Sequence, residues 1–361
     1  MNGKLREGSF LKNKLKEGIG LVLVVGGAGY VGSMLVRELL NKSYAVKVFD
    51  KFYYGEKSIE DVKDRIEIIR GDMRSMDLSV FEGVNAVINV GGLSNDPTAE
   101  YNPRANYEMN VTATETLAKL SKARGIKRFI FASSCSIYDL GLAGEDVVQD
   151  EEAKVNPKAA YSISKYDAER ILLKMVDEDF CPVILRKGTI FGFSYRMRYD
   201  LVVNTFVKDA LTKGKITILR GGEMWRPLVD ISDVVRAYLS CLEAPEDKVK
   251  GQIFNVSHNN YRISELAYRV REALREIGVK ADIEVDYTPQ NVRSYRVSTR
   301  KIESVLDFHT TCEVEDSTKD MVKMINRYAY TDFLNPRYYN IQWMTLLEET
   351  EEILKKLKSI F

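Results

Sequence analysis

The chain has 361 residues, of which 45% are hydrophobic and 29% are charged, and these ordinary values exclude a disordered, collagen-like or disulfide-stapled protein. Its 53 Lys and Arg nearly balance its 52 Asp and Glu, so the net charge gives no argument for binding to nucleic acid or to an anionic membrane. Four scattered cysteines without a CxxC pair and only two histidines argue against a zinc site and favour a reducing compartment.

The N-terminal residues 1–18 are polar and basic and lack the apolar core of a secretory signal. No apolar run in the chain reaches the ~18 residues that a membrane-spanning helix needs. We therefore expect a cytoplasmic protein without a membrane partner, in which residues 1–18 form an N-terminal extension. At ~150 residues per domain, the length predicts about two domains.

The first strong pattern is the apolar run Leu21–Val25, which has the length of a strand and glycines on both sides. A strand that is apolar at every position is buried on both faces, as in the parallel sheet of an α/β protein. Helical periodicity follows from Tyr30 to Leu40, and a second strand, Ala45–Phe49, ends at Asp50. These elements predict a β-α-β unit.

Strands and helices continue to alternate along the chain. Further strands are predicted at 66–70, 86–90, 129–133 and 183–186, and helices at 106–123 and 161–176. This alternation predicts an α/β fold with a Rossmann-type doubly wound parallel sheet over residues 19–190.

The pattern loosens after Phe191, where shorter elements are predicted: helices at 201–212, 231–242 and 263–277, and a strand at 216–219. We expect residues 191–312 to form mainly a smaller mixed α/β substrate domain, with segments near 225–260 returning to the first domain. Residues 313–361 are expected to be a C-terminal extension, to which the sequence gives no role. A cleft between the two domains is the expected ligand site.

A glycine-rich turn, Gly26 to Gly32, lies where the first strand ends and the first helix begins. Glycines there allow a tight turn and a close approach to a pyrophosphate, and the helix N-terminus supplies free N–H donors. Asp50 closes the second strand, where a carboxylate can accept the ribose hydroxyls of an adenosine and repel a 2′-phosphate. The pattern favours NAD over NADP, although Lys51 keeps NADP open. Asp72, after the third strand, is placed to contact the adenine amino group.

Tyr161 and Lys165 lie four residues apart on a predicted helix and therefore on one face. A cationic lysine beside a tyrosine favours the phenolate and lowers the pKa of the phenol, so Tyr161 is a candidate base. Ser134 follows a strand at the carboxyl edge of the predicted sheet, where doubly wound folds place their sites, and its hydroxyl can share a substrate proton.

With these residues in place, the chain resembles the extended short-chain dehydrogenase/reductase superfamily, in its NAD-dependent nucleotide-sugar epimerase/dehydratase branch. The resemblance spans about Val22 to Phe308 and rests on GGAGYVG at 26–32, Asp50, GD at 71–72, SSCSIY at 133–138, YSISK at 161–165 and WRPLVDISDV at 225–234. It implies that Tyr161 is the catalytic base, that Lys165 holds the nicotinamide ribose, and that Ser134 is the proton-sharing hydroxyl. It also implies a nucleotide-diphosphate sugar as substrate.

Together, the motifs and the resemblance predict two sets of contacts. The predicted NAD contacts are Gly26, Gly29, Tyr30, Val31, Gly32, Asp50, Asp72, Met73, Val90, Gly91, Gly92, Asn110 and Lys165. The predicted substrate contacts are Ser94, Asn95, Cys135, Ser136, Thr189, Asn204, Arg226 and Arg293, the two arginines as a clamp on the diphosphate.

Departures from the family pattern bear on the reaction. The 4,6-dehydratases place an Asp-Glu pair after the catalytic hydroxyl residue and the decarboxylases a Glu at the second of these positions, where this chain has Cys135 and Ser136. The resemblance therefore favours epimerisation, most simply at C4, with a retained NAD. A nucleotide-4-keto-sugar reductase is the alternative. A 4,6-dehydratase, or a 3,5-epimerase with Cys135 as acid/base, is less favoured, and a non-catalytic NAD(H)-binding sensor is the candidate from another class.

Two further features leave alternatives open. The basic segment 195–198 is interpreted as a charged interdomain loop, with contact to an acidic or phosphorylated sugar as the alternative. The helices at 106–123 and 161–176 resemble those that form a homodimer interface in relatives. Their apolar residues Leu117, Leu120, Ile171 and Met175 would supply the contacts, unless burial within one chain explains them.

Overall fold

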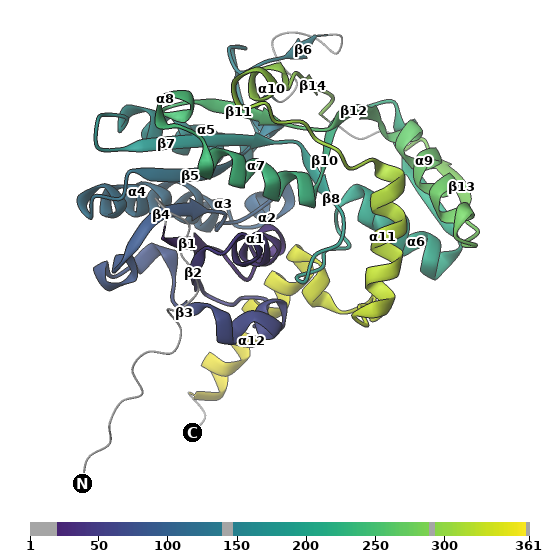
Figure 1. Cartoon of the computed structure of the whole chain (residues 1–361). Helices are drawn as coiled ribbons and strands as arrows, with labels where there is room; N and C mark the ends of the chain where they lie inside the picture. Colours follow the sequence, from purple (N-terminus) through teal and green to yellow (C-terminus); the bar gives the residue numbers. More distant parts are fainter. Residues whose placement is uncertain (1–19, 139–146, 289–292, 359–361) are drawn as a thin grey trace.

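Seven parallel strands form the central sheet, in the order β3-β2-β1-β4-β5-β7-β11 (Figure 1). This computed structural model describes residues 20–138, 147–288 and 293–358, so the predicted extension 1–18 lies outside the described residues. The strands are β1 (Leu21–Val25), β2 (Ala45–Asp50), β3 (Glu67–Arg70), β4 (Val84–Asn89), β5 (Arg128–Ser134), β7 (Cys181–Lys187) and β11 (Ile253–Val256). The order reverses beside β1, which confirms the predicted doubly wound α/β fold.

Helices cover both faces of this sheet (Figure 1). On one face, α1 (Tyr30–Asn41) and α7 (Ile231–Glu243) pack with β1 side chains such as Val22 and Val24 in one core cluster. On the other, α4 (Ala113–Ala123) and α5 (Ala160–Lys174) bury the alternate residues Leu23 and Val25 in a second cluster. Successive strand side chains point to opposite faces, so a continuous apolar strand fills both cores.

The predicted helix at 106–123 is one helical run with a wider turn inside it. It consists of α3 (Pro103–Tyr107), a π-helical turn (Glu108–Thr112) and α4. Such turns are frequent at functional sites. Here the turn carries Asn110, whose Nδ2 donates to the carbonyl of Leu93 at 3.0 Å and so fixes the loop that follows β4.

The second lobe has its own core. The small sheet β12-β10-β8 and the pair β13-β9 pack with three helices around a third apolar cluster. The strands are β8 (Thr189–Phe191), β9 (Lys215–Leu219), β10 (Trp225–Asp230), β12 (Asn259–Arg262) and β13 (Asp282–Asp286), and the helices are α6 (Val202–Lys213), α9 (Ile263–Glu276) and α11 (Val314–Arg327).

The remaining elements are short connections and one long helix. They are α2 (Asp96–Tyr101), α8 (Glu246–Val249), α10 (Arg300–Leu306), the strand pair β6 (Val148–Gln149) and β14 (Arg296–Val297), and 3₁₀ segments at Lys57–Arg65, Met73–Ser75, Leu78–Phe81, Cys135–Tyr138, Arg220–Gly222 and Pro336–Tyr338. The long helix is α12 (Asn340–Lys358).

The C-terminal segment returns from the second lobe toward the central sheet (Figure 1). Trp343 Nε1 of α12 donates to the carbonyl of Tyr53, beyond the end of β2, at 2.5 Å. On the same helix, Glu348 accepts a 2.7 Å hydrogen bond from the hydroxyl of Tyr101 in α2. Helix α12 therefore bridges the loop after β2 and the helix after β4, which is a role that the sequence did not predict.

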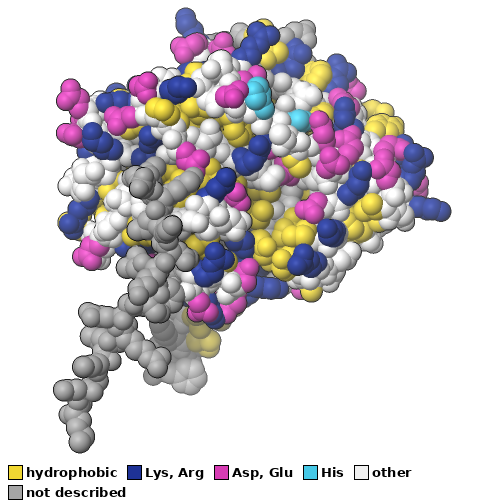
Figure 2. All heavy atoms as spheres, viewed as in Figure 1, with side chains coloured by type: hydrophobic (Ala, Val, Ile, Leu, Met, Phe, Trp, Pro, Cys, Tyr) yellow, Lys and Arg dark blue, Asp and Glu magenta, His cyan; other side chains and the backbone are white. Residues whose placement is uncertain are grey.

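The surface is mixed in charge. On the face in Figure 2, basic side chains are interspersed with acidic ones, in keeping with the near-zero net charge. Among the described helices, none is long and apolar enough to cross a membrane. The predicted dimer contact Leu117 is fully buried in the core of its own chain, so it cannot contact a second copy.

Candidate active site

A cavity of about 730 Å³ opens at the carboxyl edge of the central sheet, between the two lobes. Most of the predicted site residues line it. They are Gly26, Gly29, Tyr30, Val31, Gly32, Asp50, Asp72, Met73, Val90, Gly91, Gly92, Ser94, Asn95, Ser134, Ser136, Tyr161, Lys165, Thr189, Arg226 and Arg293. The cavity thus brings the glycine turn, the Tyr-Lys pair and the two predicted clamp arginines to one place.

The glycine turn requires glycine for steric reasons. A Cβ on Gly32 would lie 2.1 Å from the carbonyl oxygen of Gly26, and a Cβ on Gly26, whose φ is +81°, would lie 2.7 Å from Gly91. Helix α1 begins after Gly29 with no side-chain cap and no acidic residue in its first turn. Its free N–H groups and positive dipole end therefore face the cavity uncompensated, as an anion site requires.

Asp50 connects the second strand to the glycine turn. Its Oδ2 accepts from the backbone N–H of Ala28 at 2.9 Å, and its Oδ1 accepts from that of Phe52 at 2.7 Å. Burial raises the pKa of Asp50, and these backbone hydrogen bonds oppose the rise. The carboxylate is thereby fixed at the cavity wall with lone pairs left for further donors.

Asp72 also lines the cavity, but cations of its own chain already hold it. Its carboxylate accepts from Arg74 and forms a 2.8 Å ion pair with Lys51. The hydrogen bond from Arg74 is the largest cause that holds the pKa of Asp72 far below its usual range. Lys51 is thus engaged by a carboxylate of its own chain, and the predicted adenine contact of Asp72 stays a prediction.

Tyr161 and Ser134 form the reactive end of the cavity. Burial raises the pKa of Tyr161 to about 12, against the hydrogen bond with Ser134 and the charge of Arg198, which lower it. The ammonium of Lys165 lies 5.8 Å from the centre of the Tyr161 ring. The sequence-based expectation that Lys165 lowers this pKa is therefore not met, because burial dominates and Arg198 is the cation that lowers it.

The pKa of Lys165 predicts a pH dependence of stability. Burial lowers this pKa to about 8, against a nearby Glu169 charge that raises it. In the unfolded chain the amine keeps its proton to about pH 10.4. Between these values the unfolded state binds more protons, so the Lys165 contribution to stability improves as the pH rises.

We expect the Lys165→Met variant to lose this contribution. The free energy of unfolding of the wild type, relative to Lys165→Met, should rise as the pH goes from about 7.5 to about 9.5. Urea unfolding at several pH values measures it. A difference that stays flat over this range would show that the native amine titrates as it does in the unfolded chain.

A second lysine of the cavity, Lys187, is half-buried and was missed by the sequence analysis. It ends β7 in register with Ser134 at the end of β5, so both side chains project from the same face of the sheet. Its Nζ donates to the hydroxyl of Tyr238 at 3.0 Å, and burial lowers its pKa well below the usual value. The signal available in the sequence was its position at the carboxyl end of a strand.

The predicted clamp arginines lie together beside the turn after β5. Arg293 forms an ion pair with Asp96 and donates to the carbonyl of Ser136 at 3.4 Å, and Arg226 donates to the backbone carbonyl of Arg293. The Ser136 hydroxyl is buried and has no partner among the described residues. A buried polar atom without a partner at a cavity wall is a candidate ligand contact.

Three predicted contacts lie away from the cavity and are corrected. The Cys135 thiol is fully buried against the carbonyl of Arg186 at 3.1 Å, and burial raises its pKa, which removes it as an acid/base at the substrate. Asn204 is fully buried and bonds the backbone of Gly192 and Arg198 at 3.0 and 2.8 Å. Asn110 does not line the cavity, and its side chain instead holds the loop after β4 through its hydrogen bond to the carbonyl of Leu93.

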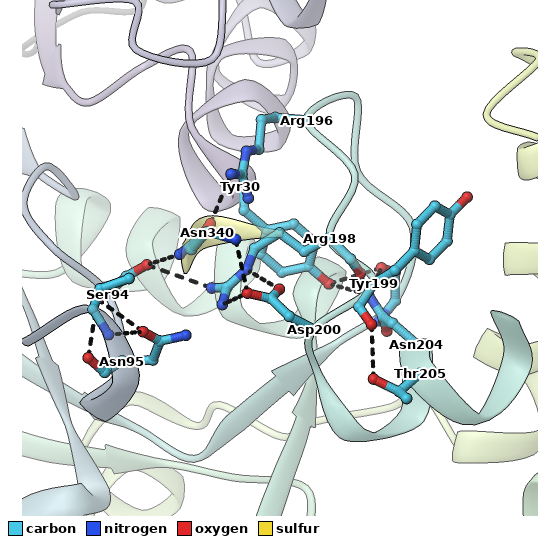
Figure 3. A network of polar contacts seen from close by, with 12 residues as sticks. Tyr30, Ser94, Asn95, Arg196, Arg198, Tyr199, Asp200, Asn204, Thr205 and Asn340 are labelled. Atoms are coloured by element: carbon cyan, nitrogen blue, oxygen red, sulfur yellow. Dashed lines mark hydrogen bonds and ion pairs between the residues drawn. The ribbon is translucent and has the colours of Figure 1, made fainter. Parts of the chain in front are cut away.

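The basic segment 195–198, interpreted above as a charged interdomain loop, lies between the lobes and reaches the cavity. Arg196 and Arg198 are 6% and 5% exposed, and both line the cavity. Figure 3 shows them beside Tyr30 of α1 and Asn340, the first residue of α12. The same helix contributes Trp343, Met344, Leu347, Glu348 and Glu351 to the cavity wall.

Comparison with known protein families identifies the one to which this chain belongs. Residues 22–257 match the profile described as the NAD dependent epimerase/dehydratase family. The chain belongs to this family. The match spans both the glycine turn and the Tyr-Lys pair, and it confirms the resemblance on which the sequence analysis relied.

Curated relatives of this NAD dependent family cover most of the chain. A "Putative UDP-glucose 4-epimerase" of Methanocaldococcus jannaschii is 26% identical over 79% of this chain and 92% of its own. The "UDP-glucuronic acid decarboxylase 6" of Arabidopsis thaliana is 25% identical over 88% of this chain and 90% of its own. Among solved structures, "MoeE5 in complex with UDP-glucose and NAD" is 25% identical, covers 86% of this chain and 100% of its own, and has a TM-score of 0.73.

The residues present fit the NAD that the family uses. The turn from Gly26 to Gly32 leaves space that a Cβ would fill, α1 directs uncapped N–H groups at it, and Asp50 stands at the end of β2. These are the three parts that a dinucleotide-binding β-α-β unit needs.

Proposed function

We propose that this enzyme is an NAD-dependent epimerase that inverts C4 of the sugar of a UDP-sugar. The observation that carries the proposal is the position of Ser134, Tyr161 and Lys165 in one cavity with the glycine turn. UDP-sugar enzymes among the relatives, including a putative UDP-glucose 4-epimerase, support the substrate class. When bound, NAD would accept hydride from the sugar carbon and return it.

The chain's own residues would handle the proton and the orientation. Tyr161 would take the proton of the C4 hydroxyl and give it back after the sugar has turned over, with Ser134 sharing the hydrogen bond. Since burial raises the pKa of Tyr161 to about 12, the phenol needs added positive charge to act near neutral pH. Lys165 would hold the nicotinamide ribose, and the oxidised nicotinamide ring would supply that charge.

The turn after β5 argues against elimination or decarboxylation. By the family resemblance, enzymes of those two reactions carry a carboxyl group there to move a second proton, whereas the two positions after Ser134 in this chain are Cys135 and Ser136. The Cys135 thiol points away from the cavity, and the Ser136 hydroxyl has no low-pKa proton to exchange. C4 inversion needs only the hydride and the Tyr161 proton.

Arg226 and Arg293 support a diphosphate as the second anionic group of the substrate. They lie in β10 and just before β14, and both line the cavity. Guanidinium groups suit the bidentate contacts that phosphate oxygens offer.

A homodimer across α4 and α5 stays a prediction, to which Leu117 does not contribute.

A panel of nucleotide sugars tests the function. The purified protein, without added cofactor, is incubated with UDP-glucose, UDP-galactose and UDP-glucuronic acid, and the products are separated by chromatography and identified by NMR. The proposal predicts conversion to the C4 epimer at unchanged mass. Loss of water or CO₂, or turnover of a 4-keto sugar only with added NADH, would contradict it.

A further inference from the structure

The loop between β8 and α6 is fastened to the first turn of α1, directly over the anion site. The Ser194 hydroxyl donates to the carbonyl of Tyr30 at 2.6 Å and lies 3.0 Å from the hydroxyl of Ser33. The backbone N–H of Arg196 donates to the same Ser194 oxygen at 3.2 Å. The second lobe therefore delivers Arg196 to the N-terminus of the helix that carries the glycine turn.

Arg196 is a buried cation without a carboxylate partner among the described residues. Its guanidinium lies 3.5 Å from the centre of the Tyr54 ring, and its Nη2 donates to Asn340 Oδ1 at 2.7 Å. Its Nε is buried and has no partner in the described part of the chain. Burial lowers the pKa of Arg196 to about 10, which reflects the cost of keeping this charge from water.

The neighbouring Arg198, unlike Arg196, is paired with a carboxylate. Its Nε and Nη2 bond the two oxygens of Asp200 at 2.8 and 3.0 Å, so its charge is already balanced (Figure 3). An unpaired buried charge is destabilising, so an anion from outside the chain would stabilise a buried cation that lacks such a pair. The uncapped N-terminus of α1 lines the same cavity as Arg196.

We infer that Arg196 binds the pyrophosphate of NAD from the side opposite the glycine turn, so that the two lobes grip the cofactor between α1 and the loop 194–198. The inference rests on the NAD site of the proposed function but not on the reaction. Arg196 Nε and Nη atoms would donate charge-assisted hydrogen bonds to the phosphate oxygens, complementing the backbone N–H groups of α1.

Asn340 is the positioning residue for Arg196. Its Oδ1 accepts from Arg196, its Nδ2 donates to the Ser94 hydroxyl at 3.1 Å, and its backbone N–H donates to Asp200 at 3.1 Å. These contacts fix the start of α12 to the loops after β4 and β8 (Figure 3). The C-terminal extension thereby gains a role, which is to hold the phosphate-binding arginine in place.

The test compares ligands that share or lack the pyrophosphate. The full chain, freed of bound nucleotide, is titrated with NAD, ADP and adenosine by calorimetry or ligand-observed NMR. For Arg196→Gln we expect the affinity for NAD and for ADP to fall about 10- to 100-fold, with adenosine unchanged, because only the first two carry a pyrophosphate. Arg275→Gln, which removes an exposed arginine on α9, is the matched control and should change none of the three.

A second variant keeps the test decisive if Arg196→Gln does not fold. Asn340→Asp retains the shape of the side chain and places a carboxylate against Arg196, which would compete with the pyrophosphate. The ratio of ADP to adenosine affinity should fall in this variant as well. A merely structural role of Asn340 would lower both affinities together and leave that ratio unchanged.

Other outcomes would overturn the inference. Equal losses for ADP and adenosine in Arg196→Gln would mean that Arg196 only supports the fold. Unchanged NAD affinity with weakened binding of UDP would assign Arg196 to the substrate diphosphate. If the wild type binds NAD but converts no UDP-sugar, the proposed function fails while the ADP-to-adenosine comparison still decides the role of Arg196.

Discussion

The Tyr161→Phe variant is expected to lose turnover of the UDP-sugar by about 10²- to 10⁴-fold, the range of a single general acid/base. The substitution removes only the hydroxyl that hydrogen-bonds Ser134 and leaves the ring in place. Among the described residues, none of the glycine turn hydrogen-bonds that hydroxyl, so the affinity for NAD should stay within about twofold. The loss should therefore appear in kcat.

Steady-state kinetics and NAD titration of the same preparation measure the two quantities separately. Tyr166→Phe is the matched control, since Tyr166 lies on the same helix α5 but lines a different pocket. It should retain wild-type turnover. Activity of Tyr161→Phe within tenfold of the wild type would exclude the phenol as the proton acceptor.

The second large effect is on stability and concerns the buried ion pair behind Lys165. Glu169 and Arg186 are 1% and 3% exposed, and Arg186 Nη2 donates to Glu169 Oε2 at 2.7 Å. Ser133 also donates to this carboxylate. Replacing Glu169 by Gln leaves the Arg186 cation buried without a counter-charge, which is expected to cost about 3–5 kcal/mol of unfolding free energy.

Urea unfolding followed by circular dichroism measures this loss. Glu272→Gln is the control, because Glu272 pairs with Arg271 at the surface and its removal should cost less than about 1 kcal/mol. Adding Arg186→Met to Glu169→Gln should recover part of the loss by removing the unpaired charge. A cost for Glu169→Gln as small as that of the control would mean that water or another group balances Arg186.

The sheet and the core of the site were predictable from sequence because their signals are local. Continuous apolar strands such as Leu21–Val25 identify a buried parallel sheet, and the glycine turn lies next to the strand that positions it. Tyr161 and Lys165 meet because four residues make about one helical turn. In each case the residues that act together are close in the chain.

Side-chain direction within a turn was not predictable in this way. Cys135 follows Ser134 directly, yet the 3₁₀ turn that starts there directs the thiol to the carbonyl of Arg186 on β7. The Tyr161 pKa also depended on burial, which a four-residue spacing does not report. Both errors arise where tertiary packing decides the outcome.

The C-terminal contribution was missed because its contacts span most of the chain. Arg196 and Asn340 are separated by 144 residues, and Trp343 and Tyr53 by 290. No local sequence pattern predicts such a pair, and the sequence of α12 alone indicates only an ordinary charged helix. Its place over the cavity is a property of the folded chain alone.

The most direct test of the central claim follows one hydrogen atom. UDP-glucose that carries deuterium at C4 is mixed with UDP-glucose that carries ¹³C in the hexose, and the protein is added without NAD. Intramolecular hydride return predicts that the epimer keeps its deuterium at C4 and that none appears on the ¹³C-labelled sugar. Transfer of deuterium between the two sugars, or its loss to solvent, would contradict C4 inversion by a retained cofactor.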